Sequence, residues 1–386
     1  MDSLPPPPRP SRCSEGSLIG VQFPSVRTRP YYFRRCKTVN PTSIESLLDE
    51  LLIEILVRLS ADDLYANVRL VCRRWYHLIH FKPFVYAHLN HTSYGLLLSY
   101  SSDYLIFITA TTQGRIEVSN LGYVIRFRHV SSCNGLTVGL EFCGKYAAFI
   151  VNPATKCRFS LPPLPVGGES GFLGIAYAAA SMEYKVVLTY IVDRIHKCAI
   201  LTVGVDKTWR SVAIAKSIGI LQTPLIIQGF MLWLLERTRI MTLNVESEVM
   251  REIHVPIFPP DYDKRRHSYC YLSTGRYLSL LIEYEHLLWQ VWEMKPETGE
   301  WRKLSRNIDL TAHKCRIQQF ALESQDDLQI VGWVKYPEVL VFVFRGIRRF
   351  CYYYNLDADE IHSIDVPVFA NFAEYAVHRN SLVWLS

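Results

Sequence analysis

A short turn pattern that returns five times beyond residue 150 is the feature that most constrains how this chain can fold. In each copy an apolar run ends in a polar turn, and the chain resumes with an apolar, a basic and an aliphatic residue. The basic positions, Arg158, Arg210, Arg251, Arg302 and His362, are 52, 41, 51 and 60 residues apart. This drifting period predicts a repeated structural unit. The copies occupy residues 152–161, 204–212, 244–253, 295–304 and 355–364.

The segments between these turns indicate β-structure. From about residue 94 onward the chain consists of short β-branched and aromatic runs between turn residues, for example YKVVLTYIV and VLVFVF. Units of about 50 residues with about four strands each are typical of β-propeller blades of kelch type, which stack because one blade cannot bury both faces alone. We expect five or six irregular, kelch-like blades without the paired glycines of regular kelch repeats. Two sheets packed as an irregular sandwich are the alternative.

Residues 44–90 are the region with a helical period. Leucine or isoleucine recurs every four residues from Leu47 to Leu59, with charged residues on the other side. Ser60 interrupts the pattern, and Ser60 or Asp62 can cap a second helix. A third helix is expected to stop before Pro83. Three helices in about 40 residues make too small a core to be stable alone. Their leucines must be covered, either by the rest of the chain or by a partner.

Residues 1–43 are predicted to be a disordered, Pro- and Arg-rich tail. They carry seven basic and two acidic residues, a net +5, so only +1 of the formal charge of +6 belongs to the other 343 residues. A nearly neutral body predicts no large nucleic-acid surface, and no apolar run reaches the roughly 18 residues of a membrane span. The ten cysteines form no CxxC pair, which fits a reducing compartment. We expect a location in the nucleus and/or cytoplasm; an organelle transit peptide is the alternative interpretation of the tail.

The helical region resembles an F-box. That motif reads Leu-Pro-x-Glu-Leu, then Glu-Ile-Leu, Asp-Leu and Val-Cys-Arg-x-Trp. This chain keeps the order, with Leu48 in place of the usual Pro and Ser60 in place of a second Pro that many members carry. The matching residues are Leu47 to Leu51, Glu54 to Leu56, Asp63 with Leu64, and Val71 to Trp75.

Later segments resemble the C-terminal associated domains of plant F-box proteins, which are kelch-like β-domains. They read SSCNGL, VNPATK, LPPLP and FLGIAYAAASMEYKVV. Together the two resemblances imply an α+β multidomain chain, with a small three-helix F-box followed by an all-β propeller. The expected divisions are a tail over 1–43, the F-box over 44–90 and the F-box-associated propeller over 91–386.

The resemblance also implies a function. F-box helices bind a Skp-type adaptor, which joins a cullin and a RING protein, while the β-domain binds a target protein. The chain would then be the non-catalytic substrate-recognition subunit of an SCF-type cullin–RING E3 ubiquitin ligase, without a cofactor. Trp75 can instead be internal core of the helical region. The adaptor contact is expected at Leu47, Leu48, Leu51, Ile55, Leu64, Val71, Cys72 and Trp75.

Other functions have weaker support in the sequence. Two His-x-x-His pairs, at 77–80 and 88–91, have metal-ligand spacing, but no cysteine pair or carboxylate triad accompanies them, so we expect no metal site. Glu283 and Glu285 would share one strand face, as a glycan-acting enzyme requires, yet a solvated strand face is the simpler interpretation. An F-box scaffold that binds its partner without ubiquitination would carry the same two domains.

Overall fold

The computed structural model describes most of the chain beyond residue 43. The expected tail lies outside the described residues. By its internal contacts the chain divides into Met1–Leu48 and Asp49–Ser386, and the second unit holds helices and sheets together. None of the helices in the described part is long and apolar enough to cross a membrane. The described residues are 44, 47–100, 104–111, 114–121, 131–142, 146–168, 171–214, 222–236, 238–255, 268–320, 328–344, 351–364 and 372–385.

A group of short helices follows Leu48. The hydroxyl of Ser60 accepts a hydrogen bond of 3.0 Å from the backbone N–H of Asp63 and so caps the second helix, as expected. The third helix ends at Ile79, before Pro83, as expected. The sequence did not predict that helix resumes directly afterwards. Pro83 lies in the first turn of a further helix, where its missing N–H has no helical partner to lose. The helices are α1 (Asp49–Leu56), α2 (Ala61–Ala66), η2 (Val68–Leu70, a 3-10 turn), α3 (Arg73–Ile79) and α4 (Lys82–His91).

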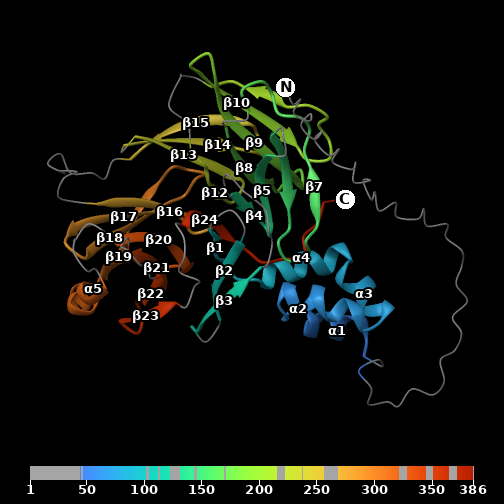
Figure 1. Cartoon of the computed structure of the whole chain (residues 1–386), viewed down its shortest axis with the longest axis horizontal. Coiled ribbons are helices and arrows are strands. Elements are labelled where there is room, and N and C mark those ends of the chain that lie inside the picture. Colours follow the sequence, from blue (N-terminus) through green and yellow to red (C-terminus); the bar gives the residue numbers. More distant parts are fainter. Residues whose placement is uncertain are drawn as a thin grey trace, which may run out of the picture. The chain divides into compact units, whose positions relative to one another are not determined.

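The remaining described residues form six four-stranded antiparallel sheets, which follow one another in chain order as propeller blades (Figure 1). Blade 1 contains β24 (Phe372–His378), β1 (Gly95–Tyr100), β2 (Tyr104–Ala110) and β3 (Ile116–Asn120); blade 2 contains β4 (Ser131–Cys133), β5 (Leu136–Phe142), β6 (Tyr146–Val151) and β7 (Arg158–Ser160). Blade 3 contains β8 (Phe172–Ala178), β9 (Glu183–Val192), β10 (Ile195–Thr202) and β11 (Arg210–Val212); blade 4 contains β12 (Leu225–Ile227), β13 (Phe230–Glu236), β14 (Arg239–Asn244) and β15 (Val249–His254). Blade 5 contains β16 (Tyr269–Ser273), β17 (Leu278–Glu285), β18 (Leu288–Met294) and β19 (Trp301–Asp309); blade 6 contains β20 (Leu328–Lys335), β21 (Val339–Phe344), β22 (Cys351–Asn355) and β23 (Glu360–Ile364). A short helical connection, η4 (Thr311–His313) and α5 (Lys314–Phe320), joins blades 5 and 6. The propeller is therefore confirmed with six blades, and the sandwich alternative was wrong.

Each neighbouring pair of blades shares one apolar cluster. Blades 5 and 6, for example, meet at Trp289, Trp333 and Phe342, which are at most 3% exposed. Because both faces of a blade are covered, its middle strands are mostly buried and largely apolar. This is why β9 is buried over seven consecutive residues, 184–190, whereas every residue of the outermost strand β15 is exposed or half-buried.

The ring closes through the last strand of the chain. β24 pairs with β1 as the innermost strand of blade 1, with Leu96 opposite Val377. His378, at the end of β24, is buried, and its Nδ1 lies 2.7 Å from the hydroxyl of Ser132 in blade 2. Burial lowers the pKa of His378 to about 3. Strand pairing and this contact join the two ends of the propeller.

The repeated turn is confirmed as the connection between the third and fourth strands of blades 2 to 6. In three copies an asparagine opens the turn, and its side-chain oxygen accepts hydrogen bonds from two following backbone N–H groups. Four residues later the chain adopts a positive φ. The corresponding connection of blade 1 has Gly114 instead of a large apolar residue before its basic residue, Arg115, so the sequence pattern finds five copies. The asparagines are Asn152, Asn244 and Asn355, followed by Lys156, Glu248 and Asp359 at φ of 60°, 57° and 53°.

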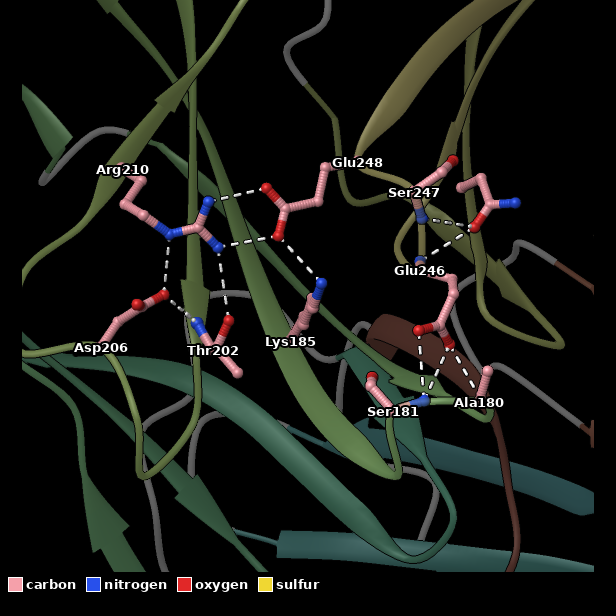
Figure 2. Close-up of polar contacts among 10 residues, drawn as sticks. Ala180, Ser181, Lys185, Thr202, Asp206, Arg210, Glu246, Ser247 and Glu248 are labelled. Carbon is pink, nitrogen blue, oxygen red and sulfur yellow. Dashed lines mark hydrogen bonds and ion pairs between the residues drawn. The ribbon is translucent and has the colours of Figure 1, made fainter.

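The basic residue of the repeat also has a structural role. In Figure 2 the guanidinium of Arg210, on blade 3, binds both carboxylate oxygens of Glu248 on blade 4 at 2.7 and 2.8 Å and Asp206 at 3.0 Å. Lys185 approaches Glu248 at 2.9 Å, and the Glu246 carboxylate accepts from two backbone N–H groups of the β8–β9 turn. The hydrogen bonds from Arg210 are the main reason that the pKa of Glu248 falls to about 2. These contacts fasten blade 3 to blade 4.

We predict that His378 makes the propeller sensitive to mild acid. The unfolded chain takes up a proton on this side chain near pH 6.5, whereas the folded chain does so only near pH 3, so stability falls as the pH drops below about 6.5. The expected slope from this one group is about 1.4 kcal/mol per pH unit. Urea unfolding at pH 7.0 and pH 5.5 should show a smaller loss of stability in His378→Gln than in the wild type. An equal loss in both proteins would contradict the assignment.

Candidate functional site

Helix α1 presents two apolar sides. Leu52 and Leu56, four residues apart, are 0% and 1% exposed, whereas Leu51 and Ile55 are 51% and 46% exposed. Residues four apart on a helix lie on the same side. One side of α1 is therefore core, and the adjacent side faces solvent.

The buried side packs on the propeller. Leu52 and Leu56 belong to the same apolar cluster as Leu136 of blade 2, Ile175 of blade 3 and Leu382 of the C-terminal segment. This cluster is the interface between blades 2 and 3, extended to include the helices. The covering that the small helical core requires comes from the chain itself.

Polar contacts fix the helices in this position. Arg379 binds the carbonyl oxygens of Leu89 and Thr92 at the end of α4. The side-chain nitrogen of Asn380 donates to Asp62 in α2 at 2.8 Å. Since both anchors directly follow β24, the strand that closes the ring also holds the helices.

The exposed apolar side chains concentrate in the helical region. Of the eighteen large hydrophobic residues that are exposed among the described residues, ten lie between 44 and 86, so this region carries most of the uncovered apolar surface. A concentration of this kind is typical of a protein–protein interaction site. We call five of them the outer apolar residues: Leu51, Ile55, Leu59, Leu70 and Val71, exposed by 51%, 46%, 38%, 72% and 59%.

An ion pair connects the segments that carry these residues. Arg74, in the first turn of α3, lies 2.6 Å from the carboxylate of Asp49, the first residue of α1. The segment with Leu70 and Val71 ends three residues before Arg74. The contact therefore brings the start of α3, and the exposed residues that precede it, toward the first turn of α1.

The residues expected to contact an adaptor lie in three kinds of position. Leu64 is fully buried, so its side chain belongs to the core rather than to the surface, and Trp75 is half-buried against the same cluster. Leu59 and Leu70 are exposed but were not among the expected contacts; the four-residue spacing that continues to Leu59 was the available signal. A contact with an adaptor stays a prediction for all of them. Leu47 is half-buried, and Leu48, Leu51, Ile55, Val71 and Cys72 are exposed.

The two departures from the F-box motif have local structural explanations. Leu48 directly precedes α1 and is 67% exposed, so replacing Pro there adds apolar surface without burying an unpaired group. Ser60 starts α2 through its hydroxyl cap instead of through a proline ring. Neither change disturbs the helices.

Comparison with protein families agrees with this architecture. Residues 96–384 match the family described as F-box associated beta propeller domain, and residues 44–91 match the family described as F-box-like. The chain is an F-box protein with an F-box-associated β-propeller. The two matches are adjacent and cover nearly all of the described part of this F-box protein.

Comparison with solved structures gives matches of low identity and low TM-score to the F-box protein. An oligogalacturonate lyase in complex with manganese is 10% identical over 73% of this chain and 81% of its own, with a TM-score of 0.40. A prolyl endopeptidase is 7% identical over 83% of this chain and 47% of its own, with a TM-score of 0.37. Oligopeptidase B from Trypanosoma brucei is 8% identical over 67% of this chain and 38% of its own, with a TM-score of 0.34. No curated protein matches the chain.

The other candidate sites have structural explanations. His88 is buried, and its Nε2 lies 3.0 Å from the carbonyl oxygen of Leu59, so it links α4 to the connection between α1 and α2. No group of three or more potential metal ligands occurs among the described residues. The carboxylate of Glu283 accepts hydrogen bonds from Ser268 and from the N–H of Leu287, and therefore fixes the ends of strands in blade 5.

We predict opposite outcomes for two adjacent leucines of α1. Leu52→Ala removes a buried side chain from the shared cluster and should lower the free energy of unfolding by about 2–5 kcal/mol. Leu51→Ala changes an exposed side chain and should alter it by no more than about 0.5 kcal/mol. Urea unfolding of the two variants provides the measurement, and each is the other's control. Equal destabilisation would contradict the assignment of the two sides.

Proposed function

We propose that this F-box protein is the substrate-recognition subunit of an SCF-type cullin–RING E3 ubiquitin ligase. The outer apolar residues bind a Skp-type adaptor, which connects the chain to cullin and RING protein, and the propeller binds the target. The chain performs no chemistry itself and works in the nucleus and/or cytoplasm. The observation that carries the proposal is an F-box whose buried side is already covered while its other apolar side is uncovered.

The size of the exposed surface fits a partner. A leucine-sized side chain contributes about 1.5–3 kcal/mol when it is fully removed from water. Five such residues supply a gross gain comparable with the roughly 4–15 kcal/mol that association costs. Aromatic side chains next to them, such as Tyr76 and Phe81, are 41% and 57% exposed and can supply further contacts.

The shared core gives the subunit a mechanism that depends on position. Because the helices and blades 2 and 3 form one cluster, an adaptor bound to the helices holds the propeller in a fixed orientation. A target on the propeller is then held near the conjugating enzyme, which raises the effective concentration of its lysines. Catalysis by proximity requires a rigid connection of this kind.

A pull-down of a Skp-type adaptor by the full chain tests the proposal. The wild type should capture the adaptor, and Leu51→Asp/Ile55→Asp should weaken capture by at least about 100-fold, because two carboxylates would have to be buried at the contact. Both positions are exposed, so the double variant should keep the wild-type unfolding midpoint.

A matched control places the same change elsewhere. Val166→Asp/Val205→Asp alters two residues of the propeller that are 85% and 63% exposed, and should leave capture unchanged. If the folded wild type captures no adaptor, or if both double variants capture it equally well, the proposal is wrong.

A further inference from the structure

A hollow of about 390 Å³ lies where the first hairpin turns of several blades converge. Its walls come from the β4–β5, β8–β9, β12–β13 and β16–β17 turns, from the end of β24, and from Tyr94 before β1. Blades 1 to 5 all contribute. Its volume falls in the range of ligand-binding pockets, about 300–1,000 Å³.

This hollow is on the same side of the propeller as the F-box. Successive strands of a blade run in opposite directions, so the turn after the first strand and the turn after the third emerge on one side. The hollow is built from the turns after the first strands. Ala154 and Val203, which pack in the apolar cluster that blades 2 and 3 share with the helices, lie in turns after the third strand of a blade. Arg379 belongs to both places, since it lines the hollow and binds the end of α4.

The charged groups at the hollow are cationic. Arg379 is the charged residue among the described lining residues, and Arg276 follows Gly275, another of them. Burial is the main cause that lowers the pKa of Arg379, and the like charge of Arg276 acts in the same direction. The Glu246 carboxylate, near Tyr177, already accepts hydrogen bonds from the N–H groups of Ala180 and Ser181.

The Arg379 guanidinium is held in place before any ligand arrives. Its Nε and Nη2 donate to the carbonyl oxygen of Thr92 at 3.3 and 3.2 Å, which fixes the plane of the group. Its carbon lies 5.0 Å from the centre of the Tyr94 ring. That ring packs against Gly275, where an added Cβ would come within 2.5 Å of it. A guanidinium held in this way presents a positive charge at a fixed position to an anion in the hollow.

The other lining residues suit a peptide. Asn134 and Gln228 offer neutral hydrogen-bonding groups, and Tyr94 and Tyr177 offer aromatic surface. Gln228, at the tip of the β12–β13 turn, is exposed. Neutral polar groups can pair with a peptide backbone without requiring a charge of their own.

We infer that this hollow binds an acidic segment of the target protein, with its Asp or Glu carboxylates attracted by Arg379, which lines the hollow, and by Arg276, which follows the lining residue Gly275. The inference rests on the proposed function and names the side of the propeller and the chemistry of the segment. We choose an acidic segment as the ligand because the hollow is positively charged. Its described lining residues include Arg379 and no carboxylate.

Selection from a random nonapeptide display library with the full chain tests this inference. The selected peptides should be enriched in Asp and Glu over the starting library. Synthetic copies of the strongest binder should bind Arg276→Gln and Gln228→Glu at least about 10-fold more weakly, since the first variant removes a cation and the second adds an anion of the same size. Both positions are exposed, so folding should be kept.

Arg194→Gln is the matched control. Arg194 is exposed in the β9–β10 turn, which emerges on the opposite side of the propeller, and its replacement makes the same change of charge as Arg276→Gln. The affinity of the Arg194→Gln variant for the peptide should equal that of the wild type. No selected peptide, selected peptides without acidic enrichment, or equal weakening by Arg194→Gln would each overturn the inference.

The assay distinguishes this inference from the proposed function. Peptide binding uses the chain without an adaptor. A chain that captures the adaptor but selects no acidic peptide refutes only the inference about the hollow. A chain that selects acidic peptides but captures no adaptor refutes the ligase proposal and leaves the hollow as a peptide-binding site.

Discussion

The apolar cluster between blades 2 and 3 is the interaction on which the rest of this structure depends. It is the one interblade cluster, among the described residues, that also contains the buried sides of the N-terminal helices. Without it the helices would be too small to fold, because three or four short helices bury little apolar surface. With it, Leu52 and Leu56 become core and Leu51 and Ile55 remain available for another molecule.

The closing strand serves two structural purposes at once. β24 completes blade 1, and the next residues, Arg379 and Asn380, hold α4 and α2. The F-box is thus fastened at the point where the ring closes, beside the hollow that Arg379 lines. Arg379 therefore connects the end of α4 directly to the lining of the hollow.

Much of this architecture could be predicted from the sequence because its signals are local. The Asn-led turns repeat because the third-to-fourth-strand connection of a blade uses their side chains, and the order from Leu47 to Trp75 identifies an F-box. Other features depend on distant residues. Leu64 and Leu51 look alike in the helical pattern. Leu64 is buried and Leu51 exposed because only Leu64 packs in the apolar cluster shared with the propeller. Likewise, Arg379 and Tyr94 are 285 residues apart, so no sequence pattern predicts that they meet.

Hydrogen–deuterium exchange of the full chain, with and without a bound Skp-type adaptor, tests most directly whether the helices have one side for the propeller and one for a partner. Adaptor binding should slow exchange at least about 10-fold in α1 and in residues 68–76. It should leave α4 and residues 379–383 unchanged, because the propeller already covers them. Slower exchange confined to α4 and residues 379–383, or faster exchange there as the helices leave the propeller, would contradict the two-sided arrangement.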